Sequence, residues 1–374
     1  MKRLFSLLVL ALSFSAIFAQ QTTVALLNHE GTITTYYGTE ALTQAHKAAM
    51  HGDVITLSGG SFTAPSSWTK AVTLRGAGCY AGENNNREVT SIGNTFKLAI
   101  PEEIETTMTF EGIDFKSSFS FSTKVKNTTF LKCHFGAAMS SVSCNTNFYN
   151  CVLNNPLGNS LTFSGAGSNL ANVNLFNCYV FGPTNSSNYV TVNFTNCIVK
   201  FSNYNGTIHG MKYAKYSNCI FLGNYKPYNT QQDNDEPSDY YIPATCIATN
   251  CLSCHCVYTA ATDLKDAIYD YTIFDEIGNT TNKCLENGTP VADAIKSVFK
   301  TYNGMDAFSF NEFYELTDEA KATYIGSDGT QIGLHGGMGF DLVPSTLQIT
   351  KCEVAPRSTT DGKLSVSIEV SIPE

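Results

Sequence analysis

Two cysteines and a histidine near residue 250 have the spacing of a cofactor site. Cys251, Cys254 and His255 fit the C-x-x-C-H pattern that binds haem covalently, and Cys254, His255 and Cys256 are residue types that ligate zinc. Zinc sites with a C-x-x-C pair normally use a second pair, which this chain lacks, and no second axial haem ligand is indicated. Because Cys251 also belongs to a repeated pattern described below, we interpret these cysteines as core or disulfide residues. We assign no metal and no cofactor to them.

A segment rich in tyrosine and acidic residues, 224–243, has the chemistry of a binding loop. Tyrosine rings stack on the faces of sugars, and carboxylates accept hydrogen bonds from sugar hydroxyls or hold Ca²⁺. A solvated loop without a ligand is the alternative interpretation. The candidate binding residues are Tyr225, Tyr228, Asp233, Asp235, Glu236, Asp239, Tyr240 and Tyr241.

A six-residue pattern recurs along residues 110–251 and organises the rest of the chain. It consists of an apolar residue, a variable one, asparagine, cysteine, a variable one and a second apolar residue, as in residues 148–153. The asparagine position falls at residues 112, 132, 150, 177, 196, 218 and 250, with steps of 20, 18, 27, 19, 22 and 32 residues. A period near 20 with short apolar segments is typical of a solenoid. The abundance of Phe, Tyr, Val, Thr and Asn favours strands and turns over helices.

Stacking of these repeats predicts two files of side chains along a parallel β-helix. Asparagine tolerates left-handed backbone angles and suits the bend of each coil. The stacked amides are expected to form a ladder of hydrogen bonds at Asn150, Asn177, Asn196, Asn218 and Asn250. The cysteines beside the ladder are expected to point inward as buried thiols rather than disulfides, at Cys133, Cys151, Cys178, Cys197 and Cys219.

The outward residue after each of these repeat positions could form a row that carries catalytic carboxylates. In chain order it holds Asp114, His134, Val152, Tyr179, Ile198 and Ile220. The row contains one carboxylate beside one histidine, whereas a glycoside hydrolase needs an acid and a base that flank one bond. We therefore interpret Asp114 and His134 as a surface ion pair on adjacent coils and assign no catalytic residue. The apolar remainder of the row predicts a strip covered by a loop or by the C-terminal appendage.

Composition and the N-terminus indicate an exported protein. The 374 residues are 43% hydrophobic and 15% charged, with a formal net charge of -9, which argues against nucleic acid and anionic membranes as partners. Lys2 and Arg3 precede an apolar stretch and Ala19, the arrangement of a cleavable secretory signal. The alternative, a membrane anchor, needs a longer apolar run. No later segment predicts a transmembrane span. The expected location is extracellular or on the outer cell surface, with the periplasm as the alternative.

The pattern divides the chain into four parts. Residues 1–19 are the signal peptide, and 20–52 contain a lead-in strand and a capping helix. The helix is expected over 39–51, with Thr39 as its cap and Leu42, Ala45 and Ala49 on one face. Residues 53–345 form the parallel β-helix with the inserted loop 224–243. Residues 346–374 alternate in polarity and predict a small β appendage.

Taken together, these motifs resemble those of secreted bacterial right-handed parallel β-helix proteins of the pectin-lyase-like group. The resemblance extends over roughly residues 38–345 and includes the repeated rungs, the segment 72–78 and the segment 48–57. It implies an all-β, right-handed parallel β-helix. Lyases of this group use acidic residues, Ca²⁺ and an arginine base, and hydrolases use clustered aspartates. Neither set of catalytic motifs is matched here.

We therefore expect a non-catalytic module that contacts glycans or acts as an adhesin, with a polysaccharide or a cell-surface glycan as its partner. The fold supports both catalytic and non-catalytic proteins, so it does not decide function alone. One alternative is a polysaccharide lyase or glycoside hydrolase of the pectin-lyase-like fold. Another is a purely structural surface element. No cofactor is expected, and Ca²⁺ is the one ion that the acidic loop would suit.

Overall fold

The computed structural model describes about three fifths of the chain in separate segments. These are residues 23–82, 88–101, 103–122, 125, 127–142, 144–155, 161–163, 171–185, 190–200, 214–222, 247–249, 252–254, 268–270, 285–286, 289–290, 298–301, 308–310, 314–345, 348–354, 362 and 366–371.

Sheet A is the longest of three stacked sheets and contains twelve strands. Apart from β1, which is antiparallel to both β2 and β3, its strands pair in parallel. In spatial order they are β2 (Thr32–Tyr37), β1 (Val24–His29), β3 (Val54–Leu57), β5 (Thr73–Arg75), β8 (Met108–Glu111), β11 (Asn127–Leu131), β14 (Asn145–Tyr149), β17 (Ala171–Phe176), β20 (Val190–Thr195), β22 (Ala214–Ser217), β24 (Ile247–Thr249) and β26 (Ile268–Asp270).

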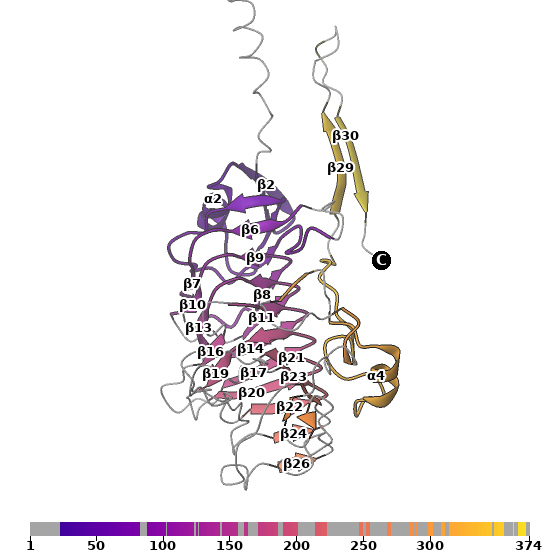
Figure 1. Ribbon diagram of the computed structural model, residues 1–374. Coiled ribbons are helices and arrows are strands. Elements are labelled where there is room, and N and C mark those ends of the chain that lie inside the picture. Colours follow the sequence, from indigo (N-terminus) through magenta and orange to yellow (C-terminus); the bar gives the residue numbers. More distant parts are fainter. Residues whose placement is uncertain are drawn as a thin grey trace, which may run out of the picture.

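Sheets B and C are also parallel. Sheet B contains β4 (Gly60–Phe62), β6 (Thr90–Ile92), β9 (Asp114–Phe115), β12 (His134–Phe135), β15 (Val152–Leu153), β18 (Tyr179–Phe181), β21 (Ile198–Lys200), β23 (Ile220–Leu222) and β25 (Leu252–Cys254). Sheet C contains β7 (Phe96–Leu98), β10 (Phe119–Phe121), β13 (Met139–Val142), β16 (Leu161–Phe163) and β19 (Pro183–Asn185). From β5 to β20 the described chain passes from sheet A to B to C and back to A, so each circuit adds one coil to the stack (Figure 1). The predicted stack of parallel coils is confirmed.

Aromatic side chains fill the centre of the coils in register. Phe130 lies between Phe110 and Phe148, with ring centroids 5.1 and 5.0 Å away and nearly parallel planes. Phe115 and Phe135 form a second stack from sheet B, with centroids 5.0 Å apart. All five rings are almost completely buried. Because parallel strands align equivalent positions of successive coils, one repeated Phe in the sequence becomes a continuous column in the core.

The predicted file of thiols is confirmed for the five cysteines of the repeat that the structure describes. All five are fully buried and none is in a disulfide. Their Sγ atoms donate weak hydrogen bonds to backbone carbonyls, as from Cys197 to the oxygens of Leu175 and Thr195 at 3.4 and 3.3 Å. Burial raises the pKa of the thiols of Cys133, Cys178 and Cys197 well above its ordinary value. These protonated thiols act as small core residues.

A helix near the N-terminus forms where the sequence predicts one. α2 (Ala41–Ala48) buries Leu42 and Ala45, and Ala49 follows it into the same core cluster as sheet A. The predicted cap is wrong, because the N-cap residue is Glu40 and no side chain caps the first turn. Among the described residues, none of the helices has the length and apolar character needed to cross a membrane.

We expect stability to fall below neutral pH because of His46 on α2. Its ring packs on Trp68, and its Nε2 accepts the backbone N–H of Thr69 at 3.1 Å. Burial, with a smaller effect of the Lys70 charge, lowers the pKa of His46 to about 4. Neutral His46 therefore stabilises the folded state above pH 6.5, and this contribution is lost as the pH falls from 6.5 towards 4.

Thermal unfolding of the wild type and of His46→Gln between pH 7 and pH 4 measures this effect, since glutamine keeps an acceptor but does not titrate. The wild type should lose more stability than the variant over this range. Equal slopes would show that another group controls the transition.

After the coils, the chain turns back along the outside of the stack. We call the described residues between 298 and 345 the strap. It contains α4 (Asp318–Thr323), which is capped by the Thr317 hydroxyl. Figure 1 shows α4 and the neighbouring strap beside the stacked strands rather than within a coil.

Two further strand pairs lie outside the three sheets. β27 (Leu285–Glu286) pairs with β28 (Thr289–Pro290), and β29 (Gln348–Val354) pairs with β30 (Val366–Ser371), both antiparallel.

Candidate functional site

The residues that the sequence singled out for ligand binding are not among those that the structure describes. All eight candidates in the loop 224–243 lie outside the described residues, so that site stays a prediction. Cys251, His255 and Cys256 also lie outside them, and Cys254 is described only as part of the backbone of β25. Within the described part of the chain, no group of three His, Cys, Asp or Glu side chains is placed to hold a metal ion.

The outward row of sheet B is aligned as the repeat predicts. Asp114 pairs with His134, and the row continues from Val152 through Tyr179 to Ile198 and Ile220. The Nδ1 atom of His134 lies 2.8 Å from the Oδ1 atom of Asp114. The predicted contact between adjacent coils is therefore confirmed, but the prediction of a surface pair was wrong, because both side chains are largely buried.

The surroundings of this pair favour a structural role. The side chains of His134 and Asp114 are only 15% and 13% exposed. The ring of Phe310 from the strap lies edge-on to His134, with centroids 5.3 Å apart. The buried Nε2 of His134 has no hydrogen-bond partner among the described residues. A carboxylate that orients an imidazole is common in catalytic sites, but acid–base catalysis also requires access for a substrate. Here an aromatic ring lies over the pair.

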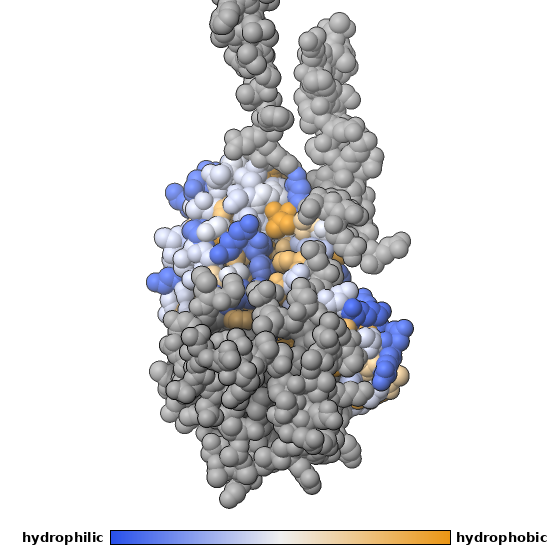
Figure 2. Space-filling model, in the orientation of Figure 1, coloured by the Kyte–Doolittle hydropathy of each residue, from blue (hydrophilic) through white to orange (hydrophobic). Residues whose placement is uncertain are grey.

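The apolar part of the same row is covered by the strap, as the sequence predicts. Val152, Tyr179, Ile198 and Ile220 are fully buried. The strap and the row form one apolar cluster, separate from the core inside the coils, to which the strap contributes Val298, Phe299, Phe308, Tyr314, Leu316, Ala320, Tyr324, Ile332, Leu334 and Leu342. The outer surface near α4 is mainly hydrophilic (Figure 2). The strap thus has one face on the apolar strip and one face in water.

Three of the asparagines at the bend between sheets A and B, Asn177, Asn196 and Asn218, contact the strap. Asn150, Asn177, Asn196 and Asn218 all have left-handed backbone angles, with φ between 49° and 55°. Asn177 donates from Nδ2 to the carbonyls of Leu334 and Gly336, at 2.9 and 2.6 Å.

The last described bend makes equivalent contacts. The Oδ1 atom of Asn218 accepts the backbone N–H of Ser327 at 3.0 Å, and its backbone carbonyl accepts the N–H of Gly333 at 2.8 Å. Asn177, Asn196 and Asn218 therefore form the attachment line of the strap.

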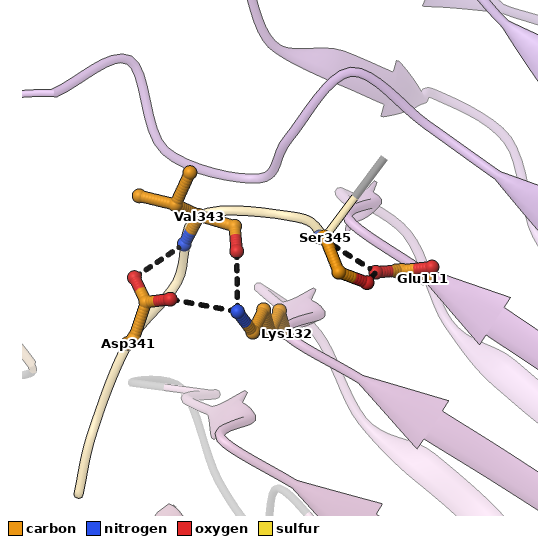
Figure 3. Close-up of polar contacts among 5 residues, drawn as sticks. All are labelled: Glu111, Lys132, Asp341, Val343 and Ser345. Carbon is orange, nitrogen blue, oxygen red and sulfur yellow. Dashed lines mark hydrogen bonds and ion pairs between the residues drawn. The ribbon is translucent and has the colours of Figure 1, made fainter. Parts of the chain in front are cut away.

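The strap continues along the same line towards the first coils. Lys132 occupies the bend position of its coil with φ 53° and donates to the Asp341 carboxylate at 2.7 Å and to the Val343 carbonyl (Figure 3). One coil earlier, Glu111 accepts hydrogen bonds from the backbone and hydroxyl of Ser345. Figure 3 shows both contacts on one stretch of the strap.

The ladder of asparagines is present, but mainly at another position. In the file predicted from the repeat, the described direct amide contact is from Asn218 to Asn196, at 3.2 Å. A longer ladder lies three residues earlier in each coil. There Asn193 donates to Asn174, and Asn174 donates to Asn147, both at 2.9 Å. In the predicted file, the contact between Asn196 and Asn218 is thus confirmed, Asn177 binds the strap instead of its neighbours, and Asn250 lies outside the described residues.

This second ladder lies on the outer face of sheet A. Along β11, β14, β17 and β20, buried residues alternate with partly or fully exposed ones, so each strand presents three outward side chains. We call these residues the Asn–aromatic face. They are Asn127, Thr129, Leu131, Asn145, Asn147, Tyr149, Asn172, Asn174, Phe176, Thr191, Asn193 and Thr195.

The Asn–aromatic face combines a polar file with an apolar one. The amide ladder of Asn147, Asn174 and Asn193 runs from strand to strand. Two residues further along each strand, the register aligns Leu131, Tyr149 and Phe176. The rings of Tyr149 and Phe176 stack with centroids 5.0 Å apart and planes within 8° of parallel. Such an arrangement offers hydrogen-bonding amides beside an apolar ridge.

The signal for this face was present in the repeat. Asparagine occupies the position three residues before the bend asparagine in three successive copies, at Asn147, Asn174 and Asn193. The side chain just before the bend is aromatic in two of them, at Tyr149 and Phe176. The predictions rested on the bend position and the position after the cysteine, and these outward residues were missed.

Comparisons with protein-family models, with curated proteins and with solved structures gave no match to this chain. Its class therefore follows from the fold alone. The chain is a mostly β protein, a β-solenoid of about six turns with three stacked parallel sheets.

Proposed function

We propose that this protein is an exported, non-catalytic module that contacts glycans through the Asn–aromatic face. The observation that carries the proposal is the stacked pair Tyr149 and Phe176 beside the ladder of Asn147, Asn174 and Asn193. The resemblance to the pectin-lyase-like group and the signal-like N-terminus support a right-handed coil, a helix α2 that caps it and an extracellular or surface location.

The chemistry of the face suits a sugar. A pyranose ring has apolar C–H groups on its faces and hydroxyls around its edge. Aromatic side chains pack against the C–H groups, and amides both donate to and accept from the hydroxyls. Because each ladder amide is already fixed by its neighbours, little side-chain entropy would be lost on binding. The parallel sheet beneath keeps the spacing of these groups constant.

Replacing both Tyr149 and Phe176 by alanine removes the rings that pack on the sugar and should weaken glycan binding by about tenfold or more. A tenfold loss of affinity corresponds to about 1.4 kcal/mol of binding free energy. A glycan array with the wild type first identifies a ligand, and calorimetry then compares the proteins. The control is Tyr37→Ala, which removes an exposed tyrosine from β2 at the end of the same sheet.

Circular dichroism checks that each variant folds. Unchanged binding by a folded double variant would remove the Asn–aromatic face from consideration. Absence of any glycan hit for the wild type would reject the function itself.

A further inference from the structure

We propose that the ligand of the Asn–aromatic face is a neutral, extended polysaccharide that lies along the axis of the solenoid. This inference depends on the proposed function and adds to it the charge of the ligand, its minimum length and its direction. Three features support it: the composition of the face, the direction of its two files, and the distribution of charge at its ends.

The face carries no charge over four successive coils. Its twelve outward residues are Asn, Thr, Leu, Tyr and Phe. This is unusual for an exposed surface, where charged residues are common. An acidic polysaccharide would need Arg or Lys to bind its carboxylates. The face offers amides, hydroxyls and rings, which match hydroxyls and C–H groups instead.

The charged residues at the two ends of the face do not change this conclusion. On the side of the first coils, Glu111 is buried, binds Ser345 of the strap and lies 3.7 Å from Arg75. On the other side, Lys215 is a single exposed cation on β22. A formal net charge of -9 for the chain further disfavours an anionic ligand.

The direction of the ligand follows from the direction of the files. Both the amide ladder and the apolar file run across the strands, from one coil to the next. Coils are about 4.8 Å apart, so four of them span roughly 15 Å. Each file covers three of these coils, the amides from β14 to β20 and the apolar residues from β11 to β17, and a polymer along the axis contacts both files. A polymer that lay along one strand would meet only the three outward side chains of that strand. It would cross each file once instead of running along it.

Calorimetry with two ligand series tests the inference. Neutral β-linked glucan and mannan oligosaccharides of increasing length are compared with oligogalacturonates of the same lengths. We expect binding by a neutral series, with affinity that rises with length until the face is filled. Raising NaCl from about 0.05 to about 0.5 M should change the affinity less than about twofold, because screening affects only charged pairs.

The outcomes distinguish the inference from the proposed function. Binding of oligogalacturonate alone, or strong weakening by salt, would overturn neutrality while leaving a glycan-binding function. Affinity that does not depend on length would overturn the axial placement. Failure of both series, together with an empty glycan array, would reject the function as well.

A pair of matched variants locates the ligand. The Oδ1 atoms of Asn145, on the face, and Asn28, outside it, each accept a backbone N–H at 2.9 Å, from Asn172 and Gly31 respectively. Aspartate preserves both hydrogen bonds but removes a donor and adds a charge. Asn145→Asp should weaken binding of the neutral oligosaccharide by about fivefold, the effect of losing one hydrogen bond, and Asn28→Asp should not.

Self-association is the competing explanation for an exposed ordered face. If the wild type forms a dimer in solution that Asn145→Asp converts to a monomer, the face is an interface between copies of this chain and the proposal is overturned. Equal effects of Asn145→Asp and Asn28→Asp on binding would overturn it too.

Discussion

Replacing Phe130 by alanine is expected to lower the free energy of unfolding by about 3–5 kcal/mol. The ring is fully buried and stacks on Phe110 and Phe148, and it also meets Phe119 and Phe135 edge-on at 5.3 Å. Its removal leaves a cavity that rigid neighbouring coils cannot fill. Denaturation in urea, followed by circular dichroism, gives the loss of stability.

Two further substitutions make this a test of which side chains face inward. Phe130→Leu keeps most of the volume and should cost less than about 1.5 kcal/mol. Phe176→Ala removes the same ring from an outward, partly exposed position on β17, where its described ring contact is with Tyr149. It should cost much less than Phe130→Ala. Equal costs for the two Phe→Ala variants would contradict the assignment of faces in sheet A.

The features that the sequence predicted best are those set by a local repeating rule. Strand alternation places Phe130, Phe148 and Cys151 inside, and asparagine tolerates the left-handed bend. About six residues therefore predict which side chains of a coil face inward and where the coil bends. Parallel stacking then copies this arrangement from coil to coil. The stack of parallel coils, the buried thiols, the row from Asp114 to Ile220 and the covered apolar strip all followed from this rule.

The strap did not follow from it, because its contacts join distant parts of the chain. Asn218 meets Ser327 across 109 residues, and Asn177 meets Leu334 across 157. No periodic signal links these positions. Sequence reasoning could identify an apolar strip that needs a cover, but it could not identify the cover or see that the bend asparagines would bind it.

The same limit explains the misplaced ladder. An amide in a stack can bond to the next amide or to another nearby carbonyl, and the choice depends on what else lies within reach. At Asn177 the strap supplies two carbonyls, so the side chain binds them. At Asn174, on the open face of sheet A, the described partners of the side chain are the amides of Asn147 and Asn193. Both side chains are the same amide, and the groups around them decided which partners they bind.

Replacing Asn177 by glycine should release the strap locally. Glycine accepts the left-handed backbone angle of this bend, so the substitution removes only the side chain and its hydrogen bonds to Leu334 and Gly336. Leaving these two carbonyls without a donor should cost about 2 kcal/mol. That corresponds to roughly thirtyfold more frequent opening of the strap. Hydrogen exchange, followed by mass spectrometry of peptides from residues 326–345, measures the opening directly.

Asn150→Gly is the matched control for this experiment. Asn150 has the same bend conformation, with φ 52° against 49° for Asn177, but its Oδ1 atom has no hydrogen-bond partner among the described residues. Both substitutions alter the unfolded chain equally, so the difference between them isolates the attachment of the strap. Asn177→Gly should accelerate exchange in the strap, and Asn150→Gly should leave it near the wild-type rate. If both variants exchange alike, the strap is held by its apolar face alone, and the file of bend asparagines serves the coil rather than the strap.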